Sequence, residues 1–281
     1  MQKITPFLWF NDNLEDAINF YTSIFNDGKI TRINRLPDGR TTMGVFQLAG
    51  SDFYALNGGP MFSFTPSVSF FVTCETKEEI DTLWGALSNG GSALMPMSKY
   101  PFSEQYGWVK DKFGISWQLN LTGAKQQVTP FLMFSGALHG QAEEAVNLYG
   151  SLFPNSSILR LERCVGGEPG TEGTVTHEAF KLAGQTFMAM DSNEDHPFSF
   201  TPAISFFVNC TTQEEVDFFW DKLSEGGRTD RCGWLSDKYG VSWQIVPQAL
   251  NEQLADPTRS KRVMDAMLKM NKIIIQDLLD A

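Results

Sequence analysis

The feature that most constrains the fold of this chain is an internal repeat, because several sequence blocks occur twice in the same order. The segment FSFTPSVSFFVTC at 62–74 returns as FSFTPAISFFVNC at 198–210, with ten of thirteen positions identical. Likewise, GWVKDKFGISWQ at 107–118 returns as GWLSDKYGVSWQ at 233–244. A chain that carries the same blocks twice is expected to fold as two similar domains in tandem.

The spacing between the repeated blocks changes most at one place. Fifteen residues separate Gly91 from Gly107, whereas five separate Gly227 from Gly233. Because insertions collect in loops, we expect the first copy to carry a ten-residue loop extension here. A length of 281 residues gives room for two domains of common size. We expect a first domain, a second domain and a C-terminal helical extension, at 1–124, 125–250 and 251–281.

Each copy repeats one order of secondary structure, as the first copy illustrates. Apolar residues at helical spacing predict helices at 14–25 and 76–88, and Thr76 with Glu79 gives the second a capping-box start. Short β-rich runs bounded by turn residues predict strands at 4–10, 29–36, 41–49, 52–57, 67–73, 93–97, 106–111 and 115–121. The fold class is therefore α+β, with a βαβββ module occurring twice in each copy. After the repeat, the apolar positions of 256–280 recur on one side and predict a C-terminal helix.

The composition argues against nucleic acid and membranes as partners. The chain has 22 basic and 33 acidic residues, a net charge of -11, and no dense basic cluster, so phosphate backbones and anionic membrane surfaces would repel it. It contains no run of about 18 apolar residues and no long apolar region typical of a signal peptide. Four scattered cysteines without a CxxC pair suggest reduced structural thiols. We therefore expect a cytoplasmic protein.

The repeated blocks resemble those of PhnB-like proteins in the vicinal oxygen chelate (glyoxalase and bleomycin-resistance) superfamily. The resemblance is carried by PFLxF followed by E-[DE]-A-x-N-x-Y, by FSFTPxxSFFVxC, by LSxGG and by GWxxDK[FY]G[IV]SWQ, and it covers nearly the whole chain. It implies two tandem domains, each of two βαβββ modules that form a U-shaped sheet around a cleft. It also implies an internal pseudo-dimer, because single-copy relatives tend to form dimers.

A demethylubiquinone methyltransferase description is sometimes attached to PhnB-like chains. The sequence gives it no support, because no Gly-rich loop follows a strand to hold a nucleoside-type cofactor.

Active members of the superfamily hold a divalent metal in the cleft with His and Glu side chains, and the metal acts there as a Lewis acid. At the matching positions, this sequence has His177 in the second copy but Met43 in the first. Gln118 and Gln244 stand where active enzymes have a Glu, and a neutral amide is a poorer ligand than a carboxylate. The resemblance therefore implies no firmly held cofactor, with His177 as a metal ligand only if a divalent metal binds.

The candidate catalytic residues are His177 and its neighbour Glu178. His177 could pair with Gln244 across the cleft as a binding group or general acid–base, or it could be a hydrogen-bonded strand histidine. Aromatic and polar residues on the expected cleft strands suit either a ligand pocket or a sheet core. The candidate ligand-binding set is Trp9, Met43, Tyr54, Trp108, Trp117, Gln118, Phe134, Trp234, Trp243 and Gln244.

Three hypotheses of function follow, and whether the protein is an enzyme stays open. The first is binding of a small molecule in the cleft of the second domain, around His177, Trp234 and Gln244, without the usual metal ligands. The second is a divalent-metal-dependent lyase or dioxygenase of the same superfamily. The third is a degenerate, structural first domain beside a functional second one, since Met43 replaces the histidine. The C-terminal helix would dock on its own domain or form a homodimer interface.

Overall fold

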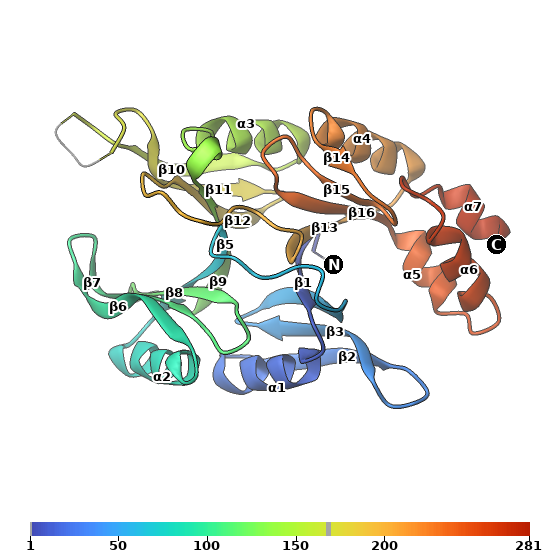
Figure 1. Ribbon diagram of the computed structural model, residues 1–281, viewed down its shortest axis with the longest axis horizontal. Coiled ribbons are helices and arrows are strands. Elements are labelled where there is room, and N and C mark those ends of the chain that lie inside the picture. Colours follow the sequence, from blue (N-terminus) through green and yellow to red (C-terminus); the bar gives the residue numbers. More distant parts are fainter. Residues whose placement is uncertain (1, 167–169) are drawn as a thin grey trace. The chain divides into compact units, whose positions relative to one another are not determined.

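The computed structural model describes residues 2–166 and 170–281, which form two compact units (Figure 1). The smaller unit contains the N-terminal residues through Pro6 together with Ser205–Ala281, and the larger unit contains Phe7–Ile204. The larger unit includes residues of both sequence copies, and the domain boundary predicted at residue 124 stays a prediction.

The first sequence copy forms two βαβββ modules, as predicted. The first module comprises β1 (Ile4–Phe10), α1 (Leu14–Ile24), β2 (Lys29–Arg35), β3 (Thr41–Leu48) and β4 (Ser51–Asn57). The second comprises β5 (Val68–Cys74), α2 (Lys77–Ser88), β6 (Ser92–Tyr100), β7 (Ser103–Lys110) and β8 (Ser116–Leu121). The predicted capping box is confirmed, because the Thr76 hydroxyl accepts the Glu79 amide at 3.2 Å and the Glu79 carboxylate accepts the Glu75 amide at 2.6 Å.

The ten-residue extension of the first copy is a longer hairpin and not the loop that we expected. It lengthens the antiparallel pair β6 and β7, in which Ser92 lies opposite Lys110 and Tyr100 opposite Ser103. β6 is the last strand of its sheet, so Pro96 removes no hydrogen bond from a central strand. The counterparts in the second copy, β14 (Arg228–Thr229) and β15 (Trp234–Ser236), are much shorter.

One eight-stranded sheet lies wholly in the larger unit, in the order β10-β11-β12-β9-β5-β8-β7-β6. Its first half comes from the second copy and consists of β9 (Gln127–Phe134), β10 (Ser157–Arg163), β11 (Val175–Leu182) and β12 (Gln185–Asp191). The two halves meet where β5 pairs antiparallel with β9, with Val68 opposite Leu132 and Thr73 opposite Gln127. This sheet is therefore built from one module of each copy.

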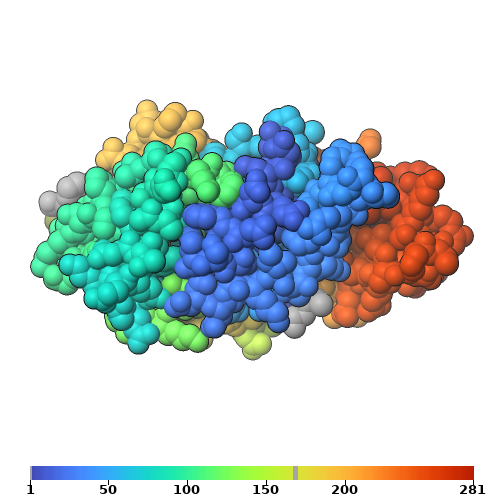
Figure 2. All heavy atoms as spheres, turned by 90° about the horizontal axis from the view of Figure 1, so that it is seen from below, coloured from blue at the N-terminus to red at the C-terminus, as the bar shows by residue number. Residues whose placement is uncertain are grey.

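Helices cover one face of this sheet. α2 packs on β7 and β8, and α3 (Ala142–Leu152) packs on β11 and β12. Large buried side chains fill this side, among them Trp117, whose ring lies 5.3 Å from those of Phe70 and Tyr21. The Tyr21 hydroxyl also donates to the buried Asp111 at 2.7 Å, which ties α1 to the second module. Figure 2 shows α1 in blue and α2 in teal on one surface of the larger unit. We call the face opposite α2 and α3 the far face.

The two FSFTP segments bind each other reciprocally within the larger unit. The Thr65 hydroxyl donates to the Ser199 carbonyl at 2.8 Å, and the Thr201 hydroxyl donates to the Ser63 carbonyl at the same distance. Equivalent residues of the two copies thus exchange equivalent bonds, as in a two-fold dimer. The predicted internal pseudo-dimer is confirmed.

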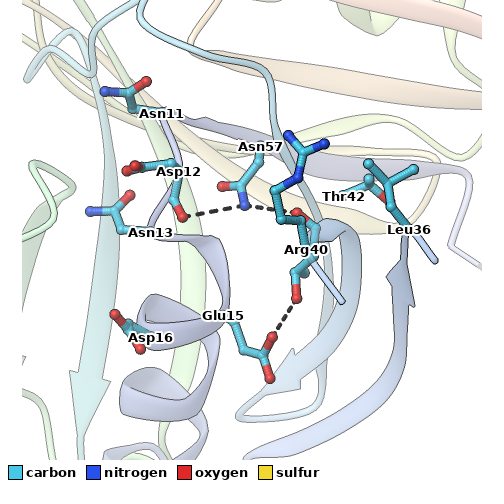
Figure 3. Close-up of a pocket in the computed structure, with 10 residues that line it drawn as sticks. Asn11, Asp12, Asn13, Glu15, Asp16, Leu36, Arg40, Thr42 and Asn57 are labelled. Carbon is cyan, nitrogen blue, oxygen red and sulfur yellow. Dashed lines mark hydrogen bonds between the residues drawn. The ribbon is translucent and has the colours of Figure 1, made fainter. Parts of the chain in front are cut away.

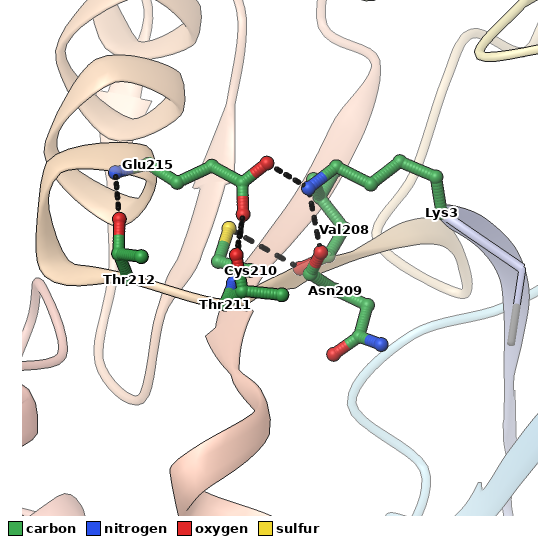
Figure 4. A network of polar contacts seen from close by, with 7 residues as sticks. All are labelled: Lys3, Val208, Asn209, Cys210, Thr211, Thr212 and Glu215. Carbon is green, nitrogen blue, oxygen red and sulfur yellow. Dashed lines mark hydrogen bonds and ion pairs between the residues drawn. The ribbon is translucent and has the colours of Figure 1, made fainter.

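The smaller unit contains the last module, with β13 (Ile204–Cys210), α4 (Gln213–Ser224), β14, β15 and β16 (Ser242–Pro247). β13 runs parallel to β16, which pairs antiparallel with β15. Figure 4 shows how the N-terminal segment attaches: the Lys3 ammonium donates to the Asn209 carbonyl at 2.7 Å and pairs with Glu215. The Glu215 carboxylate also accepts the Thr211 amide at 2.7 Å.

The single C-terminal helix predicted for 256–280 is wrong, because the segment forms α6 (Ser260–Met267) and α7 (Ile275–Asp280) after α5 (Gln248–Leu254). Between α6 and α7, the carbonyls of Met270 and Asn271 accept the amides of Cys232 and Gly233, both at 2.8 Å. These carbonyls bind the β14–β15 turn instead of continuing a helix, and Ile273 is fully buried. A homodimer through this region stays a prediction. In the described residues, no helix has the length and apolarity needed to span a membrane.

Candidate functional site

The far face of the eight-stranded sheet carries a compact group of aromatic, sulfur-containing and polar side chains. Directly paired residues on neighbouring strands point to the same face, and successive residues of a strand alternate between faces. The ladder register therefore places on the far face His177, Met188, Met190, Phe131, Ser69, Phe71, Gln118, Trp108 and Tyr106. Both copies supply members of this group.

The centre of the far face is buried although α2 and α3 lie on the other side of the sheet. Phe71, Tyr106 and Phe131 form a cluster with exposed fractions of 8%, 5% and 3%. Half-buried side chains pack against this cluster, namely Met95, Tyr100, Trp108, Met188 and Met190. The far face thus has a buried aromatic centre and a partly exposed rim of aromatic and thioether groups.

The polar side chains at the centre are bonded to one another. The Tyr106 hydroxyl donates to the Gln118 amide oxygen at 2.7 Å, and the Gln118 amide nitrogen donates to the Ser69 hydroxyl at 2.8 Å. The Trp108 indole donates to the Ser116 hydroxyl at 2.6 Å. These bonds satisfy groups that would be costly to bury alone and hold the Gln118 amide in place.

His177 lies on β11 with its ring edge against Phe131, at a centroid distance of 6.1 Å. Its Nδ1 atom is buried and has no hydrogen-bond partner. Burial lowers the pKa of the imidazole, and the positive charge of Arg160 lowers it further, whereas Glu162 acts in the opposite direction. His177 is therefore mostly neutral at pH 7, and its buried Nδ1 has no hydrogen-bond partner within the protein.

Glu178, the second predicted catalytic residue, points to the helix-covered face and away from His177. It pairs with Ala189, which is fully buried on that side, and both of its carboxylate oxygens are buried without a hydrogen-bond partner. Burial raises its pKa to about 7, and the negative charge of Glu143 contributes. Adjacent residues of a strand cannot act on the same side of the sheet, so Glu178 does not assist His177.

The residues of the far face do not fit a divalent metal. The Gln118 oxygen, which stands where the superfamily has its glutamate, already accepts the Tyr106 hydroxyl. His177 would need further His, Cys, Asp or Glu ligands, and the described residues contain no group of three or more such side chains placed to hold a metal.

Some of the other predicted ligand-binding residues lie in the core, and the rest share a face of a strand ladder in one of the two units. Trp117, Phe134 and Trp243 belong to the core, with exposed fractions of 1% or less. In the larger unit, Trp9, Tyr54 and Met43 share one face of the β1, β4 and β3 ladder. In the smaller unit, Trp234 pairs with Gln244, whose amide donates to the Ser205 hydroxyl at 2.9 Å.

The pairing of His177 with Gln244 stays a prediction, whereas Gln118 shares a sheet with His177. His177 lies on β11 and Gln118 on β8, and these two strands belong to the same sheet. Gln244 lies on β16, which belongs to a different sheet. The residues missed were Tyr106, Phe71, Phe131, Met188 and Met190. Strand alternation is the signal that could have found all but Phe131, because each of the other four lies on the same side as a predicted residue on its own strand or on the neighbouring strand.

A separate hollow of about 420 Å³ lies beside the start of α1 (Figure 3). Some of its polar groups are bonded within the protein: the Asn57 amide donates to the Thr41 carbonyl at 2.9 Å, and the Asn57 oxygen accepts the Leu14 amide at 3.1 Å. The Glu15 carboxylate accepts the Thr41 hydroxyl and pairs with Arg35, and these bonds lower its pKa. These bonds hold the start of α1 in place.

Solved structures of glyoxalase I share the fold. The enzyme from Zea mays is 12% identical over 85% of this chain and 92% of its own, with a TM-score of 0.56. Its E144Q variant is 13% identical over 87% of this chain and 94% of its own, with a TM-score of 0.57. At these identities, the similarity establishes the fold alone: the chain has two tandem copies of the fold seen in glyoxalase I.

The particular family is given by the sequence. The model of the family described as 3-demethylubiquinone-9 3-methyltransferase matches residues 2–120 and again 126–246. The chain therefore belongs to this PhnB-like family, with two family segments in tandem. A PhnB protein from Bacillus cereus is 44% identical over 43% of this chain and 100% of its own, with a TM-score of 0.42. The comparison with curated proteins gave no match.

Proposed function

We propose that the far face of the eight-stranded sheet binds a small organic molecule, which His177 orients. The observation that carries the proposal is the buried Nδ1 of His177, which has no partner inside the protein and lies beside Phe131. Leaving a buried polar atom unpaired costs about 1–3 kcal/mol, and a bound ligand would supply the missing hydrogen bond. An apolar surface with few polar groups is also typical of small-molecule sites.

Both sequence copies contribute to the proposed site. The second copy supplies His177, Phe131 and the two methionines of β12, whereas the first supplies Phe71 and the Tyr106–Gln118 pair. This arrangement favours a working role for the first copy over the degenerate, structural role considered from the sequence. In this proposal, the residues that share a face with His177 are Trp108 and Gln118. The sequence had led us to expect Trp234 and Gln244 there.

Methyl transfer, which the family description suggests, finds no fitting cofactor site on this face. A sulfonium nucleoside carries ribose hydroxyls, an ammonium and a carboxylate, and each requires a polar partner. The central polar side chains already bond to one another, through the Tyr106–Gln118 and Gln118–Ser69 hydrogen bonds. We therefore propose binding of a less polar molecule.

Methyl NMR of the protein labelled with ¹³C-methyl methionine would test the proposal. Met95, Met188 and Met190 pack at the rim of the far face, whereas Met61 is 73% exposed elsewhere and serves as an internal control. A set of aliphatic, aromatic and acidic organic compounds would be added in turn, with resonances assigned by Met→Leu variants. We expect saturable shifts confined to the three rim methionines for at least one compound. Absence of such shifts across the set would refute the proposal.

A further inference from the structure

The polar groups of the far face limit what kind of ligand it can hold. The Gln118 amide is engaged through both its oxygen and its nitrogen. Arg160, whose charge acts on His177, is held by the Glu162 carboxylate through bonds of 3.0 and 2.5 Å. In the part of the chain that the structure describes, two buried polar atoms on the far-face side of the sheet have no partner, namely Nδ1 of His177 and Oγ of Ser67, the residue just before β5. Around His177 itself, the site therefore offers a ligand one hydrogen bond, from Nδ1, and no free charge.

The apolar side chains around His177 include aromatic rings that contact one another. Phe131 meets the imidazole edge to face, and Phe71 lies nearly parallel to Phe131, with centroids 6.4 Å apart and planes inclined by 26°. Met188 and Met190 pack against this cluster. Aromatic rings and polarisable thioethers both favour contact with another aromatic ring over an aliphatic group of similar size.

The long β6–β7 hairpin extends the aromatic surface outward from the centre. Tyr100 stacks on Phe102 at 5.6 Å with an interplanar angle of 18°, and Tyr106 meets Phe102 edge to face at 5.1 Å. Phe102 lies at the turn of the hairpin and is 65% exposed. The short β14–β15 hairpin of the second copy has no room for such a group, so this extension distinguishes the two copies.

We infer that the ligand of the far face is an uncharged, planar aromatic molecule that carries a hydroxyl group. The inference rests on the proposed function. A planar ring can stack between the rings of the cluster, as the face and edge contacts already present do. A hydroxyl both donates and accepts a hydrogen bond, so it can pair with Nδ1 in either tautomer of a neutral imidazole. An anionic ligand would find no free cation among the described side chains of this face, because Arg160 is already paired with Glu162, so its charge would be buried without a partner.

Four probes of one molecular size separate these requirements. 2-Naphthol has the planar ring and the hydroxyl, naphthalene lacks the hydroxyl, decahydro-2-naphthol lacks the planar ring, and 2-naphthoate carries a charge. Dissociation constants would be measured from the rim methionine resonances. We expect 2-naphthol to bind about fivefold more tightly than naphthalene, as one hydrogen bond of about 1 kcal/mol predicts. We expect the other two probes to bind more weakly than naphthalene.

His177→Met is the matched variant, because Met43 occupies the equivalent position of the first copy and shows that the module accepts it. It should bring the affinity for 2-naphthol down to that for naphthalene, so that the advantage given by the hydroxyl disappears. Phe102→Ala removes an exposed ring, so the fold should persist while the affinities for both planar probes fall.

The outcomes distinguish the ligand class from the proposed function. Tightest binding of decahydro-2-naphthol or 2-naphthoate would overturn the aromatic, uncharged class while the site itself stands. Suppose that compounds of the wider set shift the rim-methionine resonances but none of the four probes does. This result would also overturn the ligand class and leave the site standing. No rim shift with any compound would refute both the site and the ligand class.

Discussion

Glu178→Gln should stabilise the protein in a pH-dependent way, because it removes the ionisation of a carboxyl group buried without partners. The pKa of Glu178 rises from its ordinary 4.5 to about 7 in the folded protein, mainly through burial. Between pH 4.5 and 7, the folded chain holds the Glu178 proton more tightly than the unfolded chain does. The protonated carboxyl therefore contributes to stability at low pH, and this contribution is lost as the pH rises from 4.5 through 7. At about 1.4 kcal/mol for each pH unit, ionisation above pH 7 costs the folded state about 3 kcal/mol.

The assay is urea unfolding of the wild type and the variant between pH 5 and pH 8. Near pH 5, the two should differ little, and at pH 8 the variant should be more stable by about 3 kcal/mol. Comparing the two proteins removes the contribution of other titrating groups, such as Asp111, whose pKa is also raised by burial. A difference between variant and wild type that does not change with pH would refute the reasoning.

The first copy provides a second, matched variant. Its residues at the positions of Glu178 and Val146 are Gly44 and Ile18, and a Cβ atom on Gly44 would lie 2.2 Å from the Ile18 side chain. The double variant Glu178→Gly with Val146→Ile therefore installs the apolar arrangement that the first copy already uses. It should show the same loss of pH dependence as Glu178→Gln.

Two further predictions concern the framework. Asp111→Ala should lower the free energy of unfolding by about 4 kcal/mol, because the Tyr21 hydroxyl, the Trp117 indole and two backbone amides would lose their buried acceptor; urea unfolding that changes by less than about 1 kcal/mol would contradict this. Thr76→Ala should cost about 1 kcal/mol by removing the cap of α2 at the Glu79 amide, measured as a lower midpoint of thermal unfolding, with an unchanged midpoint counting against the role of the cap.

Local features of the fold could be predicted from the sequence because they depend on short-range patterns. Helical spacing located α1 and α2, and the turn residues located the strands of both modules to within a few residues. Strand alternation would also have shown that Glu178 faces away from His177, had it been applied to that pair. The break between α6 and α7 could not be foreseen, because it depends on carbonyls of Met270 and Asn271 that bind a distant turn.

The sequence by itself determined the duplicated βαβββ order, the family and the presence of a single candidate histidine. Only the tertiary structure decided which modules share a sheet, and so placed His177 with Gln118 instead of Gln244. The physical reason is that both copies carry nearly the same strand sequences, such as SFFVTC and SFFVNC, so the local pattern does not distinguish one partner strand from the other. Strand partners are fixed by long-range packing, as in the pairing of β5 with β9, and that pairing built the candidate site from both copies.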